Sequence, residues 1–383
     1  MTIYMDNAAT TFPKPPAVIE AVRKCLKTGA VNAGRGVYAL ALEADKLIHQ
    51  TRLQVASLLN YSKGQTIFTP SVTIALNQVL LGMTWEAGDF IYTTPFEHNS
   101  VARVLEQIRK AYSVEIITIP VDQALNYQID RLEELFQSKP PKAVAMTHVS
   151  NVCGLITPVT EIARLAKKQG AIVVVDGAQA GPLLPLDKAE EIVDYYIFSG
   201  HKTFYGPFGI AGFVTNGRIK TKPILFGGTG SHSELLTMPE DLPFAYEVGS
   251  PNIVAIAGLQ AACNWIEQVG PSQIVEHEQS LLEKLVAGLA EFDEVQLYIN
   301  SDLRQHLGTL SFTVEEYTAQ EIGMILSQEF NIAVRTGLHC APLAHQFLGT
   351  LPHGTVRVGL GYWNTEDQIE ILLQAIQEIL EAY

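Results

Sequence analysis

Residues 194–203, Asp-Tyr-Tyr-Ile-Phe-Ser-Gly-His-Lys-Thr, run from an apolar stretch into a polar cluster that carries Lys202. A little upstream, residues 171–179, Ala-Ile-Val-Val-Val-Asp-Gly-Ala-Gln, end in the same manner and carry Asp176. Each apolar run is short, rich in β-branched or aromatic side chains and followed by glycine, which is typical of a buried parallel strand. Open α/β sheets bind their ligands at the carboxyl ends of such strands. We therefore predict that Lys202 and Asp176 face one ligand site.

Apolar runs of this kind alternate with amphipathic segments along the first 250 residues, without repeats or low-complexity stretches. The alternation predicts a mostly parallel sheet with helices between its strands. The seven expected strands are residues 67–69, 90–93, 115–119, 143–147, 171–175, 195–198 and 210–214. From residue 249 onward, longer helical segments dominate. The predicted fold is therefore α/β, with a large domain over residues 15–250 and a smaller α+β domain that combines residues 1–14 with 251–383.

The composition predicts a large core and an acidic surface. The chain has 383 residues, of which 47% are hydrophobic and 17% charged, as in ordinary globular enzymes. Its net charge of −14, without any Lys/Arg-rich block, argues against nucleic acid or an anionic membrane as a partner. The amino-terminal residues lack the basic and apolar regions of a signal peptide, and no apolar run approaches ~18 residues. We expect a cytoplasmic protein that does not enter a membrane.

Residue spacing excludes several other kinds of site. The four cysteines are Cys25, Cys153, Cys263 and Cys340. They are far apart and show no CxxC or Cys/His ligand spacing, so we expect no metal site, no disulfide and four buried thiols. A P-loop is excluded because His201 separates Gly200 from Lys202, and the dinucleotide pattern GxGxxG occurs nowhere.

A lysine and a carboxylate at one sheet edge are the two groups that pyridoxal phosphate needs, an amine for an imine link and an acid beside the pyridinium nitrogen. An ordinary lysine has a pKa of ~10.4, so under about 1% of its molecules carry the nucleophilic neutral amine at pH 7. Enzymes put such an amine to use by forming an imine with an aldehyde. A carboxylate ~4 Å from the ring nitrogen gains on the order of 4 kcal/mol at an effective dielectric of ~20. Lys202 and Asp176 are thus the expected pair, and Gln179 can bond the phenolic oxygen of the ring without adding charge. Taken alone, Asp176 is also compatible with a helix cap or a turn.

The phosphate of this cofactor needs hydroxyls and backbone N–H groups near the start of a helix. Residues 71–73, Ser-Val-Thr, lie between an expected strand and an apolar helical segment, so Thr73 is a candidate ligand. Ser199 and His201 flank the lysine and can reach the same phosphate. A plain N-cap is the competing interpretation of residues 71–73. His98 follows another strand at the same edge, where an imidazole can stack on the ring and shuttle protons, although a lone histidine is usually structural.

Ordered motifs along the whole chain resemble those of one enzyme family. They are Tyr4-Met-Asp-Asn-Ala-Ala-Thr10, Glu97-His98, Thr147-His-Val-Ser-Asn151, Asp176-Gly-Ala-Gln179, Ser199-Gly-His-Lys202, Gly249-Ser-Pro-Asn252, Arg335-Thr-Gly-Leu-His-Cys340-Ala341, and Arg357 before Tyr362-Trp-Asn-Thr365. In these motifs the chain resembles the class V pyridoxal-phosphate enzymes, in particular the short-loop (group II) cysteine desulfurase and selenocysteine lyase family. The resemblance implies fold type I of the pyridoxal-phosphate-dependent transferases, with the cofactor in the large domain.

The resemblance also implies roles for individual residues. Those implied at the cofactor ring are Lys202, Asp176, Gln179, His98 and Asn151. Those implied at the phosphate are Val72, Thr73, Ser199 and His201, with Ser250 reaching the phosphate of the partner subunit in a homodimer. Those implied at the substrate carboxylate are Asn151, Arg335 and Arg357. A planar guanidinium such as that of Arg357 is shaped for a bidentate carboxylate contact.

Cys340 separates sulfur chemistry from ordinary amino-acid chemistry. In the short-loop family the nucleophilic cysteine stands in this Arg-x-Gly-x-His-Cys setting, where Arg335 and His339 would both favour its thiolate. The implied reaction begins with loss of the Cα proton of L-cysteine to Lys202. Cys340 then attacks the substrate sulfur, so that alanine leaves and a persulfide stays on the protein. The competing interpretation is a free cysteine that only packs.

Three positions depart from the family pattern. Leu338 stands where many relatives have a second histidine, Val72 replaces a hydroxyl residue and Ile74 replaces an acidic one. The preferred substrate and the sulfur acceptor therefore stay open. The leading hypothesis is a cysteine desulfurase that delivers sulfur to an acceptor protein, for iron-sulfur cluster or related assembly. The alternatives are a selenocysteine lyase, a class V aminotransferase or lyase in which Cys340 takes no part, and an inactive dimer that docks sulfur carriers.

Overall fold

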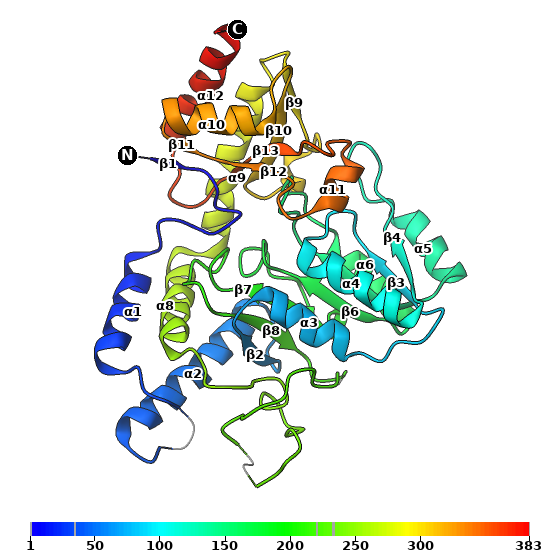
Figure 1. The fold of residues 1–383 in the computed structure, drawn as a ribbon, viewed down its shortest axis with the longest axis vertical. Coiled ribbons are helices and arrows are strands. Elements are labelled where there is room, and N and C mark those ends of the chain that lie inside the picture. Colours follow the sequence, from blue (N-terminus) through cyan, green and yellow to red (C-terminus); the bar gives the residue numbers. More distant parts are fainter. Residues whose placement is uncertain (1, 34–35, 220, 232–233, 383) are drawn as a thin grey trace.

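A computed structural model describes residues 2–33, 36–219, 221–231 and 234–382 of the chain. Its larger sheet has seven strands in the order β2-β8-β7-β6-β5-β3-β4 (Figure 1). The strands are β2 Gln65–Thr69, β3 Phe90–Thr93, β4 Glu115–Thr118, β5 Pro141–Thr147, β6 Ile172–Asp176, β7 Tyr195–Ser199 and β8 Ala211–Thr215. In the described part of the sheet, β8 pairs in antiparallel fashion with β2 and β7, and all the other strand pairs are parallel. The predicted seven-stranded, mostly parallel sheet is confirmed.

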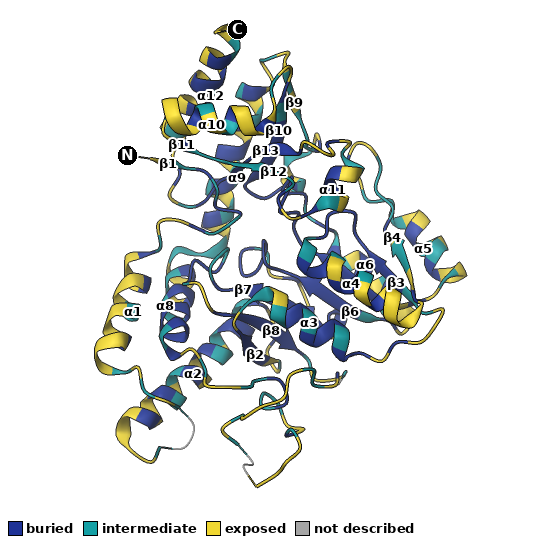
Figure 2. Cartoon of the chain, in the orientation of Figure 1, coloured by how far each residue is buried: buried dark blue, intermediate teal, exposed yellow. Residues whose placement is uncertain are grey.

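Helices cover both faces of this sheet, because its central strands are apolar on both sides. One face carries α3 (Val72–Gly82) and α4 (Asn99–Tyr112), which pack on Ile91 and Ile197 of the sheet. The helices of the other face are α1 Pro16–Thr28, α2 Ala39–Leu58, α5 Ile129–Ser138, α6 Val159–Lys168, α7 Ala189–Ile192 and α8 Ile253–Val269. The buried sheet and the exposed outer sides of the helices are visible in Figure 2. No helix in the described residues is both long and apolar enough to cross a bilayer.

A second, antiparallel sheet forms the carboxyl-terminal part of the molecule, in the order β12-β13-β10-β9. Its strands are β9 Val295–Leu297, β10 Thr309–Val314, β12 Arg335–Gly337 and β13 Thr355–Gly359. The helices of this part are α9 Pro271–Leu289, α10 Ala319–Glu329, α11 Pro342–Phe347 and α12 Glu366–Glu381. This part has its own apolar core, which includes Leu281, Leu310, Phe312, Ile369 and Leu372. Helix α8 belongs to the core of the larger sheet although it follows residue 250, and the division into domains stays a prediction.

The amino-terminal segment contacts both parts of the molecule and forms a third, two-stranded sheet. Its strand β1 (Ile3–Tyr4) pairs in parallel with β11 (Ile332–Ala333). Farther along, the Thr10 hydroxyl donates to the backbone oxygen of His201 at 2.9 Å, and Lys14 Nζ donates to the same oxygen at 2.7 Å. The backbone next to Lys202 is therefore held by residues near the amino terminus of the chain.

Candidate active site

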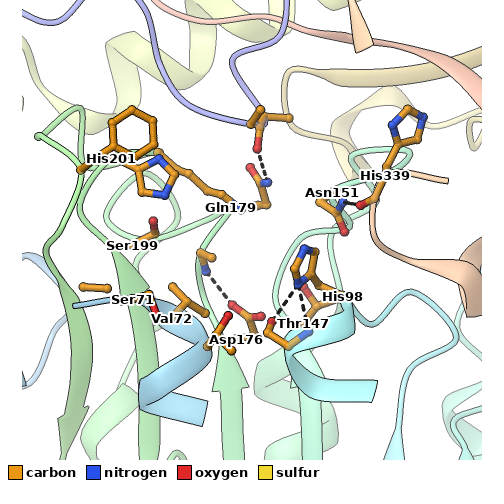
Figure 3. Close-up of a pocket in the computed structure, with 18 of the residues that line it drawn as sticks. Ser71, Val72, His98, Thr147, Asn151, Asp176, Gln179, Ser199, His201 and His339 are labelled. Carbon is orange, nitrogen blue, oxygen red and sulfur yellow. Dashed lines mark hydrogen bonds between the residues drawn. The ribbon is translucent and has the colours of Figure 1, made fainter. Parts of the chain in front are cut away.

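A cavity of about 320 Å³ lies at the carboxyl ends of β2, β5, β6 and β7, the edge at which the sequence predicts a ligand. The predicted site residues that line it are Val72, Thr73, His98, Asn151, Asp176, Gln179, Ser199, His201, Lys202, Arg335 and Arg357. Figure 3 labels Val72, His98, Asn151, Asp176, Gln179, Ser199 and His201 among them. Two predicted residues, Ser250 and Cys340, lie outside this lining, and both are exposed. Eleven of the thirteen predicted residues thus surround one space of the size that holds a small ligand.

Lys202 and Asp176 influence each other across the cavity. Burial lowers the pKa of Lys202 to about 8, although the charge of Asp176 opposes this change. Asp176 closes β6, and its Oδ1 accepts a hydrogen bond from the N–H of Ala178 at 3.0 Å. Burial raises the pKa of Asp176, while that hydrogen bond and Lys202 act to lower it. Lys202 is therefore an amine that loses its proton close to neutral pH, as a nucleophilic amine should.

This pKa predicts how Lys202 should react in the cofactor-free protein. Only the neutral amine is a nucleophile, so modification by trinitrobenzenesulfonate should rise with pH, reach half its maximum near pH 8 and then level off. An ordinary lysine would go on rising toward ~10.4. The measurement is the modification rate at the peptide that contains residue 202, followed by mass spectrometry from pH 6 to 10.5.

A second variant, Asp176→Asn, tests the cause of this pKa, because it removes the negative charge that raises the pKa of Lys202. The midpoint for Lys202 should move below that of the parent protein. A midpoint above pH 10 in the parent, or an unchanged midpoint in the variant, would contradict the electrostatic description of the pair.

Three polar groups meet at the α3 end of the cavity. The hydroxyl of Ser71 caps α3 by accepting from the N–H of Ile74 at 3.3 Å. Ser199 Oγ and His201 Nδ1 are buried and have no hydrogen-bond partner in the described chain. Burial and the charge of Lys202 lower the pKa of His201 to about 3, so its ring is neutral and can donate one N–H. Unpaired buried donors beside a helix amino terminus fit a phosphate group.

Hydrogen bonds to the backbone hold Gln179 and His98 at the sides of the cavity. Gln179 Nε2 donates to the oxygen of Ala8 at 2.7 Å, which leaves its second N–H for another acceptor. His98 is the N-cap of α4, because its Nδ1 accepts from the N–H of Ser100 at 3.0 Å. Burial and the charge of Lys202 lower the pKa of His98 to about 4. The two interpretations of His98 are thus compatible, since a neutral ring caps a helix and also lines the cavity.

Arg357 and Asn151 lie together at the other end of the cavity. Arg357 is 1% exposed and donates from Nη1 to the backbone oxygen of Asn151 at 2.8 Å. Its Nη2 donates to Asp6 Oδ1 at 2.5 Å, while its Nε is buried without a partner among the described groups. Asn151 Nδ2 in turn donates to the backbone oxygen of His339 at 2.8 Å. The guanidinium is fixed by two of its five N–H groups, and the unpaired N–H on Nε is among those left for another acceptor.

Cys340 lies on a tightly held loop after β12. The expectation of four buried thiols is wrong at this position, because Cys340 is exposed while the other three cysteines are buried. Its Sγ is 3.6 Å from Nη2 of Arg335, which lines the cavity. His339 and Cys340 both have positive φ, at 47° and 58°. Such a conformation costs roughly 1–2 kcal/mol per non-glycine residue. Here it is held in part by Asn99, whose N–H donates to the Cys340 oxygen at 2.7 Å.

His339 does not supply positive charge to the thiol. Its ring is buried, and Nε2 is 3.0 Å from the hydroxyl of Thr355. Burial and the charge of Arg357 lower its pKa to about 2, so the ring is neutral. A neutral His339 adds no charge beside the Cys340 thiol, and Arg335 is the cation that contacts the sulfur. The predicted role of His339 toward the thiolate stays a prediction.

Several residues around the cavity are not among the predicted site residues. Phe208 stacks on His201, with ring centroids 4.4 Å apart, and nothing in the sequence distinguishes it from other aromatic residues. Glu97 lies behind the cavity, where its Oε1 accepts from the N–H of Thr147 at 2.8 Å. Burial raises the pKa of Glu97 to about 8, which makes it a neutral acid at pH 7. Its place directly before His98 is the signal that the sequence offers for it.

Comparisons with known proteins give a consistent picture. The model of the family "Aminotransferase class-V" matches residues 3–372. A "Probable cysteine desulfurase" of Methanothermobacter thermautotrophicus is 31% identical over 383 residues, covering 98% of this chain and 94% of that protein. The apo structure of a cysteine desulfurase from Thermococcus onnurineus has a TM-score of 0.91 at 31% identity, covering 100% of this chain and 95% of that one. A cysteine desulfurase structure from Escherichia coli has a TM-score of 0.84 at 27% identity, with coverages of 100% and 95%.

Proposed function

The chain belongs to the class V aminotransferase family, and from this premise we propose that it is a cysteine desulfurase that works with pyridoxal phosphate. The enzyme converts L-cysteine to L-alanine and takes the sulfur onto Cys340 as a persulfide. One observation carries the proposal. A single cavity brings Lys202 and Asp176 together with Arg357, and the exposed thiol of Cys340 lies against Arg335 of the same cavity.

The side chains that line the cavity suit pyridoxal phosphate. Lys202 would hold its aldehyde carbon and Asp176 its ring nitrogen, with His98 above the ring. The groups for the phenolic oxygen and the phosphate would be Gln179, Val72, Thr73, Ser199 and His201. Bound in this way, pyridoxal phosphate supplies an electron sink for the bond-breaking at the substrate Cα.

The chain's own groups then have distinct tasks. Arg357 and Asn151 bind the α-carboxylate of L-cysteine and so fix the orientation of the amino acid. Lys202, with its lowered pKa, accepts the Cα proton as a general base. The thiolate of Cys340 attacks the substrate sulfur, so that an S–S bond forms as the C–S bond breaks. The electron pair of the C–S bond stays with carbon, which is protonated and leaves as alanine.

The direct test is to incubate the cofactor-loaded protein with L-cysteine. Alanine, measured by chromatography, and persulfide on the Cys340 peptide, measured by mass spectrometry, should form in equal amounts in the first turnover. Selenocysteine, tested in parallel, shows whether the selenium analogue is preferred. Transfer of the amino group to a keto acid without persulfide would contradict the proposal and would instead support a class V aminotransferase.

The working form that we propose is a cytoplasmic homodimer with residues 15–250 as the cofactor-binding domain. Ser250 is exposed and outside its own cavity, which suits a residue that serves the partner subunit. Large apolar side chains at Val37, Phe226 and Leu236 are also exposed, as expected where a second subunit covers the surface. The sulfur on Cys340 would pass to an acceptor protein for iron-sulfur cluster assembly or a related use, since an exposed persulfide is open to a second protein.

A further inference from the structure

Arg357, the proposed carboxylate binder, already has a carboxylate partner within the chain. Its Nη2 donates to Asp6 Oδ1 at 2.5 Å, and the two side chains are 1% and 21% exposed. Its Nη1 is occupied by the backbone oxygen of Asn151, which carries no net charge. The positive charge that would attract a substrate carboxylate is therefore largely offset by Asp6.

The contact is fixed by the backbone on both sides. Asp6 forms a parallel bridge with Gly359, two residues beyond Arg357 at the end of β13. The Tyr4 hydroxyl donates to the backbone oxygen of Asp6 at 3.0 Å. Arg357 itself lies in register between Ser311 of β10 and Arg335 of β12. The backbone segments from which both side chains extend are therefore held next to each other.

Asp6 is also the negative charge among several positive ones. Burial lowers the pKa of Arg357, Asp6 raises it, and Arg335, which lies opposite across the strand pair, lowers it further. Lys202 feels the positive charge of both arginines. Asp176 already offsets the charge of Lys202. Without Asp6, an incoming carboxylate would meet the two arginines without the acid that pairs with Arg357.

Asp6 has two opposing effects on carboxylate binding. It orients the guanidinium, which favours binding, and it neutralises the guanidinium, which weakens binding. Orientation survives without Asp6, because burial and the Asn151 oxygen still hold Arg357, and one hydrogen bond between charged groups is worth roughly ten- to a hundredfold. A unit charge ~4 Å away shifts an equilibrium by roughly a thousandfold at an effective dielectric of ~20, so neutralisation is the larger effect.

We propose that Asp6 is a resident counter-ion that limits how tightly Arg357 holds an α-carboxylate, so that the alanine product can leave the site. The inference rests on the proposed function, because it takes Arg357 as the group that binds the substrate carboxylate. Asp6 should therefore change the affinity for amino acids and leave the affinity for amines without a carboxylate unchanged.

The test compares Asp6→Asn with the parent holoenzyme, using L-cysteine and cysteamine, which has the same thiol and amine but no carboxylate. We expect Asp6→Asn to lower the KM for L-cysteine and the inhibition constant of L-alanine by about tenfold or more, with the cysteamine constants unchanged. The control for a change of charge alone is Asp302→Asn, at an exposed ion pair with Arg304. It should leave all of these constants as in the parent.

A measurement on the parent enzyme covers the case in which Asp6→Asn does not fold. Propionate, a carboxylate without an amine, should not inhibit the parent below about 10 mM, because Asp6 already neutralises Arg357. Inhibition below that concentration would overturn the inference.

The outcomes separate this inference from the proposed function. A parent enzyme that handles cysteamine as well as L-cysteine would overturn the carboxylate assignment of Arg357, and the Asp6 inference with it. A parent that prefers L-cysteine, together with an Asp6→Asn variant whose constants for L-cysteine and L-alanine are unchanged or higher, would overturn the Asp6 inference alone.

Discussion

Replacing Lys202 with alanine is expected to abolish the visible absorbance of the purified protein and to lower the turnover of L-cysteine by about 10⁴ or more. Two losses combine in this variant, since one amine both holds the cofactor and accepts the Cα proton. Lys202 lines an open cavity, so its truncation removes little packing and the protein should still fold. The measurements are the absorbance spectrum after purification with excess pyridoxal phosphate and the initial rate of alanine formation.

The control for this experiment is Lys139→Ala, which removes a lysine from an exposed ion pair with Glu115. That variant should keep both the spectrum and the rate. A yellow Lys202→Ala protein with more than a tenth of the parent rate would show that another amine holds the cofactor.

The second large effect is expected from Cys340→Ser. A hydroxyl of the same shape cannot take sulfur as a persulfide, so persulfide should be undetectable and alanine formation should fall by about 10²–10³. The spectrum of the bound cofactor should stay as in the parent, because Cys340 lies outside the cavity lining. Protein-bound persulfide and alanine are measured after a single addition of L-cysteine.

Cys25→Ser is the matched control, since it makes the same atomic change at a buried cysteine packed between α1 and α8. It should leave the yields of persulfide and alanine unchanged. If Cys340→Ser released sulfide at the parent rate, Cys340 would not be the nucleophile, and its contact with Arg335 would have no catalytic meaning.

The sequence predicts the large sheet and its ligand edge well, for a physical reason. Buried parallel strands are apolar on both faces, so each appears as a short continuous apolar run followed by glycine and polar residues. The polar residues after such runs, among them Asp176 and Lys202, must meet at one edge of the sheet. Their proximity follows from strand direction alone and needs no knowledge of side-chain packing.

Contacts made by packing at the carboxyl-terminal part could not be predicted in this way. The pairing of Asp6 with Arg357 joins residues 351 positions apart, and no local pattern signals it. The neutral state of His339 depends on burial and on Arg357, which the motif around Cys340 does not reveal. Cys340 is exposed on a loop with two consecutive residues of positive φ, a conformation that their residue types do not favour.

The pairing of β1 with β11 has a consequence for biosynthesis. At elongation rates of roughly 5–20 residues per second, β1 leaves the ribosome roughly 15–65 seconds before the strand that it pairs with. The nascent chain can meanwhile complete the seven-stranded sheet and present Lys202, whereas Arg357 is still to be translated. The enzyme thus acquires its amine before its carboxylate receptor, and the site is complete only after Arg357 has been translated.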